Sequence, residues 1–171
     1  GFTGSVRFEV ILTVDDWAVV DPTKAKNPRN VGTGIMGRKS GEQSNLLTAF
    51  TFDIEEVRDG LPVAFETEAQ KSARLAELGF NVLEYAICHS LDEAVAFFER
   101  IKQCREELPF WIDGVVLKAN DVAHQVALGV TSGKPKGQTV WKFDSAGAVA
   151  TLTDVLISGG HTGALIPTAK F

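Results

Sequence analysis

Residues 108–118 read Leu-Pro-Phe-Trp-Ile-Asp-Gly-Val-Val-Leu-Lys and place an acid and a lysine around an apolar segment typical of a strand. Side chains alternate between the two faces of a strand, so Asp113 and Lys118, an odd number of residues apart, should face opposite ways. Both reach one pocket only if the strand bends or bulges, which Gly114 permits. A buried strand with polar ends is an equally good interpretation of these residues alone.

Outward from this stretch, strand and helix patterns follow one another without a strict βαβ order. Runs of β-branched and apolar residues predict strands over 6–14, 48–54, 81–87, 111–118, 139–143 and 151–157. Capping-box patterns at 67–70 and 90–93 predict a helix after each, with a further short helix over 121–128. Residues 21–44 are expected to be a long loop, with or without a short helix. This mixture favours an α+β fold with largely antiparallel sheets.

The composition of the 171 residues argues against several classes of protein. The formal net charge of −5 disfavours a general nucleic-acid binder, because neutralising phosphates takes clustered Lys and Arg, but it is compatible with a domain that touches DNA at one point. No apolar run approaches the roughly 20 residues of a membrane span, and no secretory leader is visible. Cys88 and Cys104 lack metal-ligand spacing, so we expect reduced thiols and a cytoplasmic location. Because the chain opens on Gly1, we expect a processed product or a piece of a longer protein.

Five blocks of this sequence resemble, in order, the motifs of NAD-dependent DNA ligases. The stretch 108–118 is similar to the fourth nucleotidyltransferase motif of that family, and Arg105 also fits it. The other blocks are Val6-Arg7-Phe8-Glu9-Val10, similar to the third motif; Asn27-Pro28-Arg29-Asn30 followed by Arg38; Trp141-Lys142-Phe143, similar to the fifth motif; and residues 160–167, similar to the entry into the family's OB-fold domain. Together they cover nearly the whole chain, which makes coincidence a poor explanation.

The resemblance implies the α+β core of covalent nucleotidyltransferases, with mixed, mainly antiparallel sheets flanked by helices, incomplete at its N-terminus. Residues 1–153 would be part of the adenylation domain, from the third motif onward, and residues 154–171 the start of the OB-fold domain. A ligase of this family passes AMP from NAD to an enzyme lysine, then to a DNA 5′-phosphate, and finally seals the nick. NAD as AMP donor and Mg are thus the implied cofactors, and nicked double-stranded DNA is the implied partner.

The resemblance also assigns roles to individual residues of the nucleotide site. Lys118 and Lys142 would be catalytic, because such in-line displacements at phosphorus depend on positioning and on cations at the phosphate oxygens. Glu9 would accept hydrogen bonds from ribose hydroxyls, and Arg105 would join Glu9 and the two lysines in binding the cofactor. Asp113 is a possible ligand of Mg²⁺, which often binds through one or two carboxylates and substrate phosphates.

Arg29 and Arg38 would bind phosphates of the DNA, where a planar guanidinium contacts two oxygens at once. Arg38 stands one residue later than in the family pattern, which weakens its assignment. Plainer interpretations exist for several of these residues: both arginines fit a solvated loop, Lys142 fits a solvated strand edge, and Glu9 fits an exposed pair with Arg7.

The printed sequence contains no Lys-x-Asp-Gly, the motif that carries the family's nucleophilic lysine. The tetrapeptide Val-Arg-Asp-Gly at 57–60 has no lysine at the required place and lies too late in the chain, so we expect the chain alone not to self-adenylylate. Two explanations are open. The chain is part or a subunit of a functional ligase whose lysine lies on a companion chain or a missing N-terminal segment, or it is a non-catalytic ligase-fold relic that binds a nucleotide or a partner. The presence of Glu9, Asp113, Lys118 and Lys142 favours the first.

Overall fold

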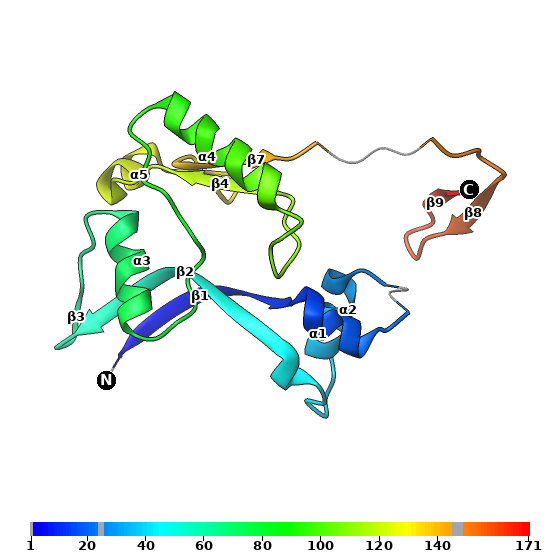
Figure 1. The fold of residues 1–171 in the computed structure, drawn as a ribbon, viewed down its shortest axis with the longest axis horizontal. Coiled ribbons are helices and arrows are strands. Elements are labelled where there is room, and N and C mark those ends of the chain that lie inside the picture. The colour runs from blue at the N-terminus through cyan, green and yellow to red at the C-terminus, as the bar shows by residue number, and fades with distance from the viewer. Residues whose placement is uncertain (1, 24–25, 145–148) are drawn as a thin grey trace.

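The computed structural model describes residues 2–23, 26–144 and 149–171 (Figure 1). In chain order, its elements are β1 (Gly4–Leu12), α1 (Val14–Val20), α2 (Pro28–Met36), the short 3₁₀ helix η1 (Ser44–Leu46), β2 (Leu47–Arg58), β3 (Leu61–Pro62), α3 (Glu68–Glu77), α4 (Leu91–Cys104), β4 (Gly114–Lys118), α5 (Val122–Leu128), β5 (Val130–Thr131), β6 (Lys134–Pro135), β7 (Gln138–Lys142), β8 (Asp154–Gly159) and β9 (Leu165–Lys170). All pairs of these strands are antiparallel, which confirms the predicted α+β class with antiparallel sheets. None of the described helices is long and apolar enough to cross a membrane.

A three-stranded sheet in the order β1–β2–β3 carries helix α3. β1 and β2 pair from Gly4 opposite Glu56 to Leu12 opposite Leu47, and the register shifts between Arg7 and Phe8. The shift leaves Phe52 as an extra residue in β2, which is a β-bulge.

Helices α3 and α4 begin where the sequence predicts. The capping box of α3 is complete, with Thr67 and Gln70 each bonding the backbone of the other. At α4, Ser90 accepts from the backbone N–H of Glu93, but the Glu93 carboxylate accepts from His89 rather than from Ser90. The second box is therefore only half formed.

β4 and β7 form a two-stranded ribbon whose one face is covered by α4 (Figure 1). Phe98 of α4 packs against Trp141 and Phe143, with ring centroids 5.8 Å and 5.1 Å apart. The register between the strands is unbroken, so Gly114 does not form the bulge that the sequence allowed. The chain bends at Asp113 instead, and Gly114 is needed because a Cβ atom there would lie 2.3 Å from the carbonyl oxygen of Trp141.

Helices α1 and α2 build a small core with the end of β1. Leu12, Trp17 and Ile35 form its buried centre. α1 was not expected, and its first residue, Val14, was assigned to the predicted strand 6–14; the helix starts there because Thr13 caps it. α2 lies within the predicted loop 21–44 and is the short helix that the sequence left open.

Residues 81–87 do not form the predicted strand. Only Val82 makes a bridge, parallel to Thr51. Leu83, Tyr85 and Ile87 are 44%, 50% and 49% exposed, and Glu84 and Ala86 between them are exposed as well, so the alternation in sequence does not become a buried and an exposed face. Within the described residues, this single bridge to β2 is not continued along the segment, and an extended segment without a ladder of hydrogen bonds is not held as a strand.

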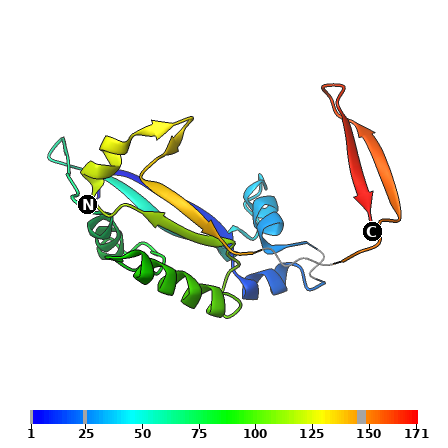
Figure 2. The ribbon, with the colours of Figure 1, turned by 90° about the horizontal axis from the view of Figure 1, so that it is seen from above.

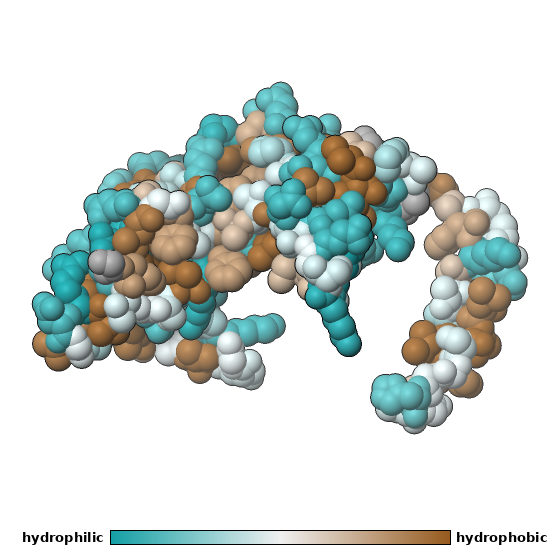
Figure 3. Space-filling view, turned by 90° about the horizontal axis from the view of Figure 1, so that it is seen from below, coloured by the Kyte–Doolittle hydropathy of each residue, from teal (hydrophilic) through white to brown (hydrophobic). Residues whose placement is uncertain are grey.

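β8 and β9 form a hairpin that stands apart from the other elements (Figures 1 and 2). Every residue of both strands is exposed. Figure 3 shows hydrophobic residues on the surface of this hairpin, and Ile157 and Leu165 are 68% and 71% exposed. A lone two-stranded hairpin is marginally stable in water, so these strands need further structure around them.

Candidate functional site

The face of the β4–β7 ribbon turned away from α4 carries both lysines predicted to be catalytic. Directly opposed residues of an antiparallel pair point the same way, so one face consists of Gly114, Val116, Lys118, Gln138, Val140 and Lys142. Val116 and Val140 at its centre are 54% and 48% exposed. Lys118 and Lys142 lie at opposite ends, roughly 13 Å apart at a rise of about 3.3 Å per residue. The ribbon thus offers an open apolar surface with a cation at each end.

At one end of this face, Lys142 forms an ion pair with Asp113, with 2.9 Å between Nζ and Oδ2. The hydrogen bond from Lys142 lowers the pKa of Asp113, and the charge of Arg29 adds a smaller effect in the same direction. The two side chains are 68% and 77% exposed, so the pair is open to a ligand. The structure therefore brings Arg29, Asp113 and Lys142 to the same end of the ribbon.

Arg105 lies on the other side of the ribbon. Its guanidinium carbon is 5.6 Å from the centre of the Phe143 ring. Phe143 is buried and faces α4, whereas its neighbour Lys142 faces away from that helix. Arg105 therefore does not touch the open face directly, and its role as a cofactor ligand stays a prediction.

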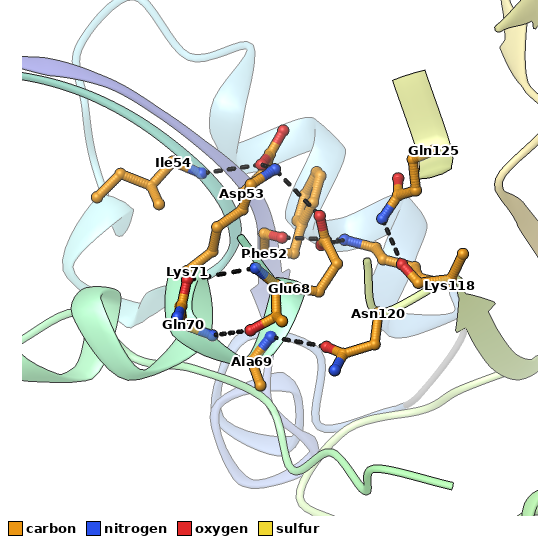
Figure 4. A network of polar contacts seen from close by, with 12 residues as sticks. Phe52, Asp53, Ile54, Glu68, Ala69, Gln70, Lys71, Lys118, Asn120 and Gln125 are labelled. Atoms are coloured by element: carbon orange, nitrogen blue, oxygen red, sulfur yellow. Dashed lines mark hydrogen bonds and ion pairs between the residues drawn. The ribbon is translucent and has the colours of Figure 1, made fainter. Parts of the chain in front are cut away.

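At the other end of the face, Lys118 is held by two oxygen atoms (Figure 4). Its Nζ donates to Oε2 of Glu68 and to the carbonyl oxygen of Phe52, both at 3.1 Å. Nζ also lies 5.8 Å from the centre of the Phe52 ring. The bulge explains this arrangement, because the extra residue of a bulge leaves the ladder and its carbonyl is available to a side chain.

Further charges continue from Glu68 across α3 to the first sheet. Lys71 lies 3.0 Å from Oε1 of Glu68 and 3.0 Å from Oδ1 of Asp53, and Arg7 lies 3.8 Å from Asp53. Burial alone would lower the pKa of Lys71, but the hydrogen bonds to Asp53 and Glu68 outweigh it and raise the pKa. Lys71 thus stays charged. Positive and negative side chains alternate along the network, in the order Lys118, Glu68, Lys71, Asp53 and Arg7.

The structure does not join Glu9 or Arg38 to either lysine. Glu9 is exposed on β1, opposite Phe50. Arg38 is exposed just after α2 and donates to the Gln43 side chain and the Glu42 carbonyl. It lines a hollow of about 290 Å³ between α1 and α2. Their predicted roles, ribose binding for Glu9 and phosphate binding for Arg38, stay predictions.

The described residues do not by themselves form a metal site. No group of three or more His, Cys, Asp or Glu side chains among them is arranged to hold an ion. The carboxylate predicted for Mg²⁺, that of Asp113, is engaged by Lys142. Mg²⁺ at Asp113 would need further oxygen ligands, which a phosphate-bearing ligand supplies. The open face itself fits such a ligand, since it pairs an apolar surface with the exposed Lys142 at one end and the half-buried Lys118 at the other.

Sequence reasoning missed Glu68 and Phe52. The signal for Glu68 was present but ambiguous, because an acid in the first turn of a capped helix is expected for helix stability alone. No sequence pattern predicts the role of Phe52, because a β-bulge depends on how two strands pair and cannot be recognised from the sequence of either strand alone.

Comparison with known proteins shows what the chain is similar to. The family model of the NAD-dependent DNA ligase adenylation domain matches residues 4–146. The chain is 37% identical over 147 residues to a DNA ligase of Rhodopseudomonas palustris (strain BisB5), covering 84% of this chain and 20% of that protein. It is 32% identical over 176 residues to a DNA ligase of Syntrophobacter fumaroxidans (strain DSM 10017 / MPOB), covering 97% and 26%. The chain thus spans about a fifth to a quarter of the length of the curated relatives it matches.

Proposed function

Because the chain belongs to the family of the NAD-dependent DNA ligase adenylation domain, we propose that it is part of such a ligase and binds the adenylate on the open face of the β4–β7 ribbon. The observation that carries the proposal is the pairing of an exposed apolar surface, Val116 and Val140, with Lys118 and Lys142 at its ends. The valines would contact the adenine base, and the lysines would meet phosphate oxygens.

The two lysines act by placing a fixed positive charge where negative charge develops on the phosphate oxygens. In-line displacement at a phosphate is favoured by fixed cations at its oxygens, which cost no rearrangement during the reaction. Lys142 can leave Asp113 for a phosphate because the pair is exposed. Mg²⁺, bound through Asp113 and the phosphates, would supply further positive charge. Arg29, at the same end, would bind a phosphate of the nicked duplex.

The nucleophilic lysine lies outside these 171 residues in this proposal, because they contain no Lys-x-Asp-Gly. A companion chain or further sequence of the same protein supplies it, together with a cover for the open face. Residues 1–153 then belong to the adenylation domain. The hairpin of β8 and β9 begins the OB-fold domain, which its separate position and full exposure support.

AMP binding to the chain tests the site. Isothermal titration should give a Kd that rises about ten- to hundredfold in Lys118→Ala and in Lys142→Ala, since each loses charge-assisted hydrogen bonds of about 1.5–3 kcal/mol. Lys170→Ala, on the exposed hairpin, is the matched control and should bind as the unaltered chain does. Equal affinity in all four proteins would contradict the proposed site.

Nick sealing distinguishes a working ligase part from a relic. With a polypeptide that carries the family's Lys-x-Asp-Gly segment, the chain should seal nicked DNA in the presence of NAD and Mg²⁺. A chain that binds AMP but never supports sealing would be a nucleotide-binding relic of the ligase fold.

A further inference from the structure

A carboxylate outside the predicted site holds one of the site's lysines. A lysine ammonium group has three N–H donors. For Lys118, two of them have partners, the carboxylate of Glu68 and the carbonyl of Phe52, both at 3.1 Å (Figure 4). Among the residues that the structure describes, the third donor has none. Lys118 therefore has a fixed ammonium group with one donor left over.

Glu68 is itself fixed relative to Lys118 by the backbone. Its N–H donates to the carbonyl of Asn120 at 2.9 Å, and the Asn120 side chain accepts from the N–H of Ala69 at 3.2 Å. Asn120 follows Lys118 by two residues, so the start of α3 is tied to the end of β4. The distance between the Glu68 carboxylate and the Lys118 ammonium is thus set by the fold and not by two free side chains.

Glu68 orients Lys118 without cancelling its charge. The other oxygen of the carboxylate, Oε1, lies 3.0 Å from Lys71. One negative charge is therefore divided between two ammonium groups, and the side chains of Glu68 and Lys71 are only 15% and 17% exposed. Lys118 keeps much of its attraction for an anion while its position is held.

We propose that Glu68 is a positioning residue of the nucleotide site. Together with the carbonyl of Phe52 at the β-bulge, its carboxylate accepts two of the three N–H donors of Lys118, and the third N–H of Lys118 remains for a phosphate on the open face. The inference rests on the proposed function for the identity of that phosphate, an adenylate. The hold on Lys118 does not depend on it.

Nitrogen-15 NMR of the lysine ammonium groups tests both statements in the intact chain. Lys118→Arg assigns the Lys118 signal. Glu68→Ala should raise the hydrogen exchange rate of that ammonium roughly tenfold, the equivalent of about 1.4 kcal/mol and within the range for a hydrogen bond to a charged group. Glu68→Gln removes the same charge but keeps an acceptor oxygen, so its rate should lie between those of Glu68→Ala and the unaltered chain. Glu77→Gln, on the exposed side of the same helix, is the matched control and should change nothing.

Addition of AMP separates this inference from the proposed function. AMP should shift the Lys118 signal and leave that of Lys71 in place, because Lys71 is engaged by two carboxylates. If Glu68→Ala leaves the exchange of Lys118 unchanged while backbone spectra show a folded chain, the positioning role is wrong, whatever AMP does. If the unaltered chain shows a slow Lys118 signal that AMP never moves, the hold stands and the proposed function is wrong.

Discussion

At the scale of single residues, the ion pair of Asp113 and Lys142 is too exposed to contribute much to stability. Its side chains are 68% and 77% exposed, and pairs of this kind are worth about 0–1 kcal/mol. Asp113→Asn should therefore lower the free energy of unfolding by less than about 1 kcal/mol, measured by urea titration at pH 7. A loss of several kcal/mol would mean that the pair holds the ribbon together and was not free for a ligand.

The ion pair of Glu56 with Arg74, unlike that of Asp113 with Lys142, should contribute to stability. Glu56 is 5% exposed and accepts two hydrogen bonds from Arg74, at 2.7 Å and 2.8 Å. The hydrogen bonds from Arg74, which outweigh the effect of burial, and the hydrogen bond from Arg58 lower the pKa of Glu56 from its ordinary 4.5 to about 2. A depressed carboxyl pKa stabilises the folded state fully above the unfolded pKa and progressively less below it.

The stability that Glu56 provides should thus be intact above pH 4.5 and be lost as the pH falls toward 2. Urea unfolding at a series of pH values measures it. Glu56→Gln should flatten this part of the profile, whereas Glu77→Gln, whose side chain is 65% exposed, should leave the slope as it was. A Glu56→Gln profile as steep as that of the unaltered chain would show that other carboxylates cause the acid loss.

At the scale of elements, Gly114 decides whether β4 and β7 pair closely. A Cβ atom there would lie 2.3 Å from the Trp141 carbonyl oxygen and 2.9 Å from the Lys142 Cα, both of them backbone atoms. Gly114→Ala should force the strands apart and cost about 1–3 kcal/mol of unfolding free energy, the usual range for overpacking. Gly159→Ala is the control, because its Cβ would meet nothing within 4 Å. Equal stability of both variants would contradict the close pairing.

Elements that carry a local signal were predictable, and elements that depend on distant partners were not. The capping residues of α3 and α4 lie next to the helices they start, so sequence alone located both. Residues 81–87 have the apolar alternation of a strand in sequence, but they pair with β2 at one bridge only. The bulge at Phe52 exists only because β1 pairs with β2. For the same reason the motifs suggested Lys118 and Lys142 as site residues, which stays a prediction, but not Glu68, which reaches Lys118 only through the fold.

At the scale of the whole molecule, the first half of the stretch 108–118 joins parts that the sequence could not relate. The carbonyl of Pro109 accepts from the N–H of Val14, at 2.8 Å. Phe110 contacts Phe50, and Trp111 contacts Trp17, with ring centroids 5.1 Å and 5.3 Å apart. These contacts hold the ribbon beside the first sheet and the α1–α2 core, which explains why aromatic residues precede Asp113.

In the proposed function, the chain binds AMP on the open face of the ribbon but does not form a covalent bond with it. Formation of an enzyme–AMP bond requires a lysine nucleophile placed in line with the leaving group, and no lysine of the 171 residues stands in Lys-x-Asp-Gly. Incubated alone with NAD and Mg²⁺, the chain should show no added AMP in intact-mass spectrometry. With a polypeptide bearing the motif, the AMP mass should appear on that polypeptide only. Lys118→Ala and Lys142→Ala should each slow its appearance by orders of magnitude, since loss of a group that stabilises developing charge costs about 3–4 kcal/mol in comparable sites.

The control for this experiment needs a lysine outside the open face. Lys170→Ala, on the hairpin, should leave the rate unchanged; Lys24, which belongs to none of the matched motifs, lies outside the described residues. An AMP mass on a lysine of the isolated chain would place the nucleophile within these residues. Lys118 and Lys142 are then the first candidates to map by peptide sequencing, because they lie on the face proposed to bind AMP. To attack, either side chain must lose a proton and leave its partner, Glu68 or Asp113. The proposal that the nucleophile comes from outside would in that case be wrong, and the adenylate would sit on the ribbon as a covalent adduct.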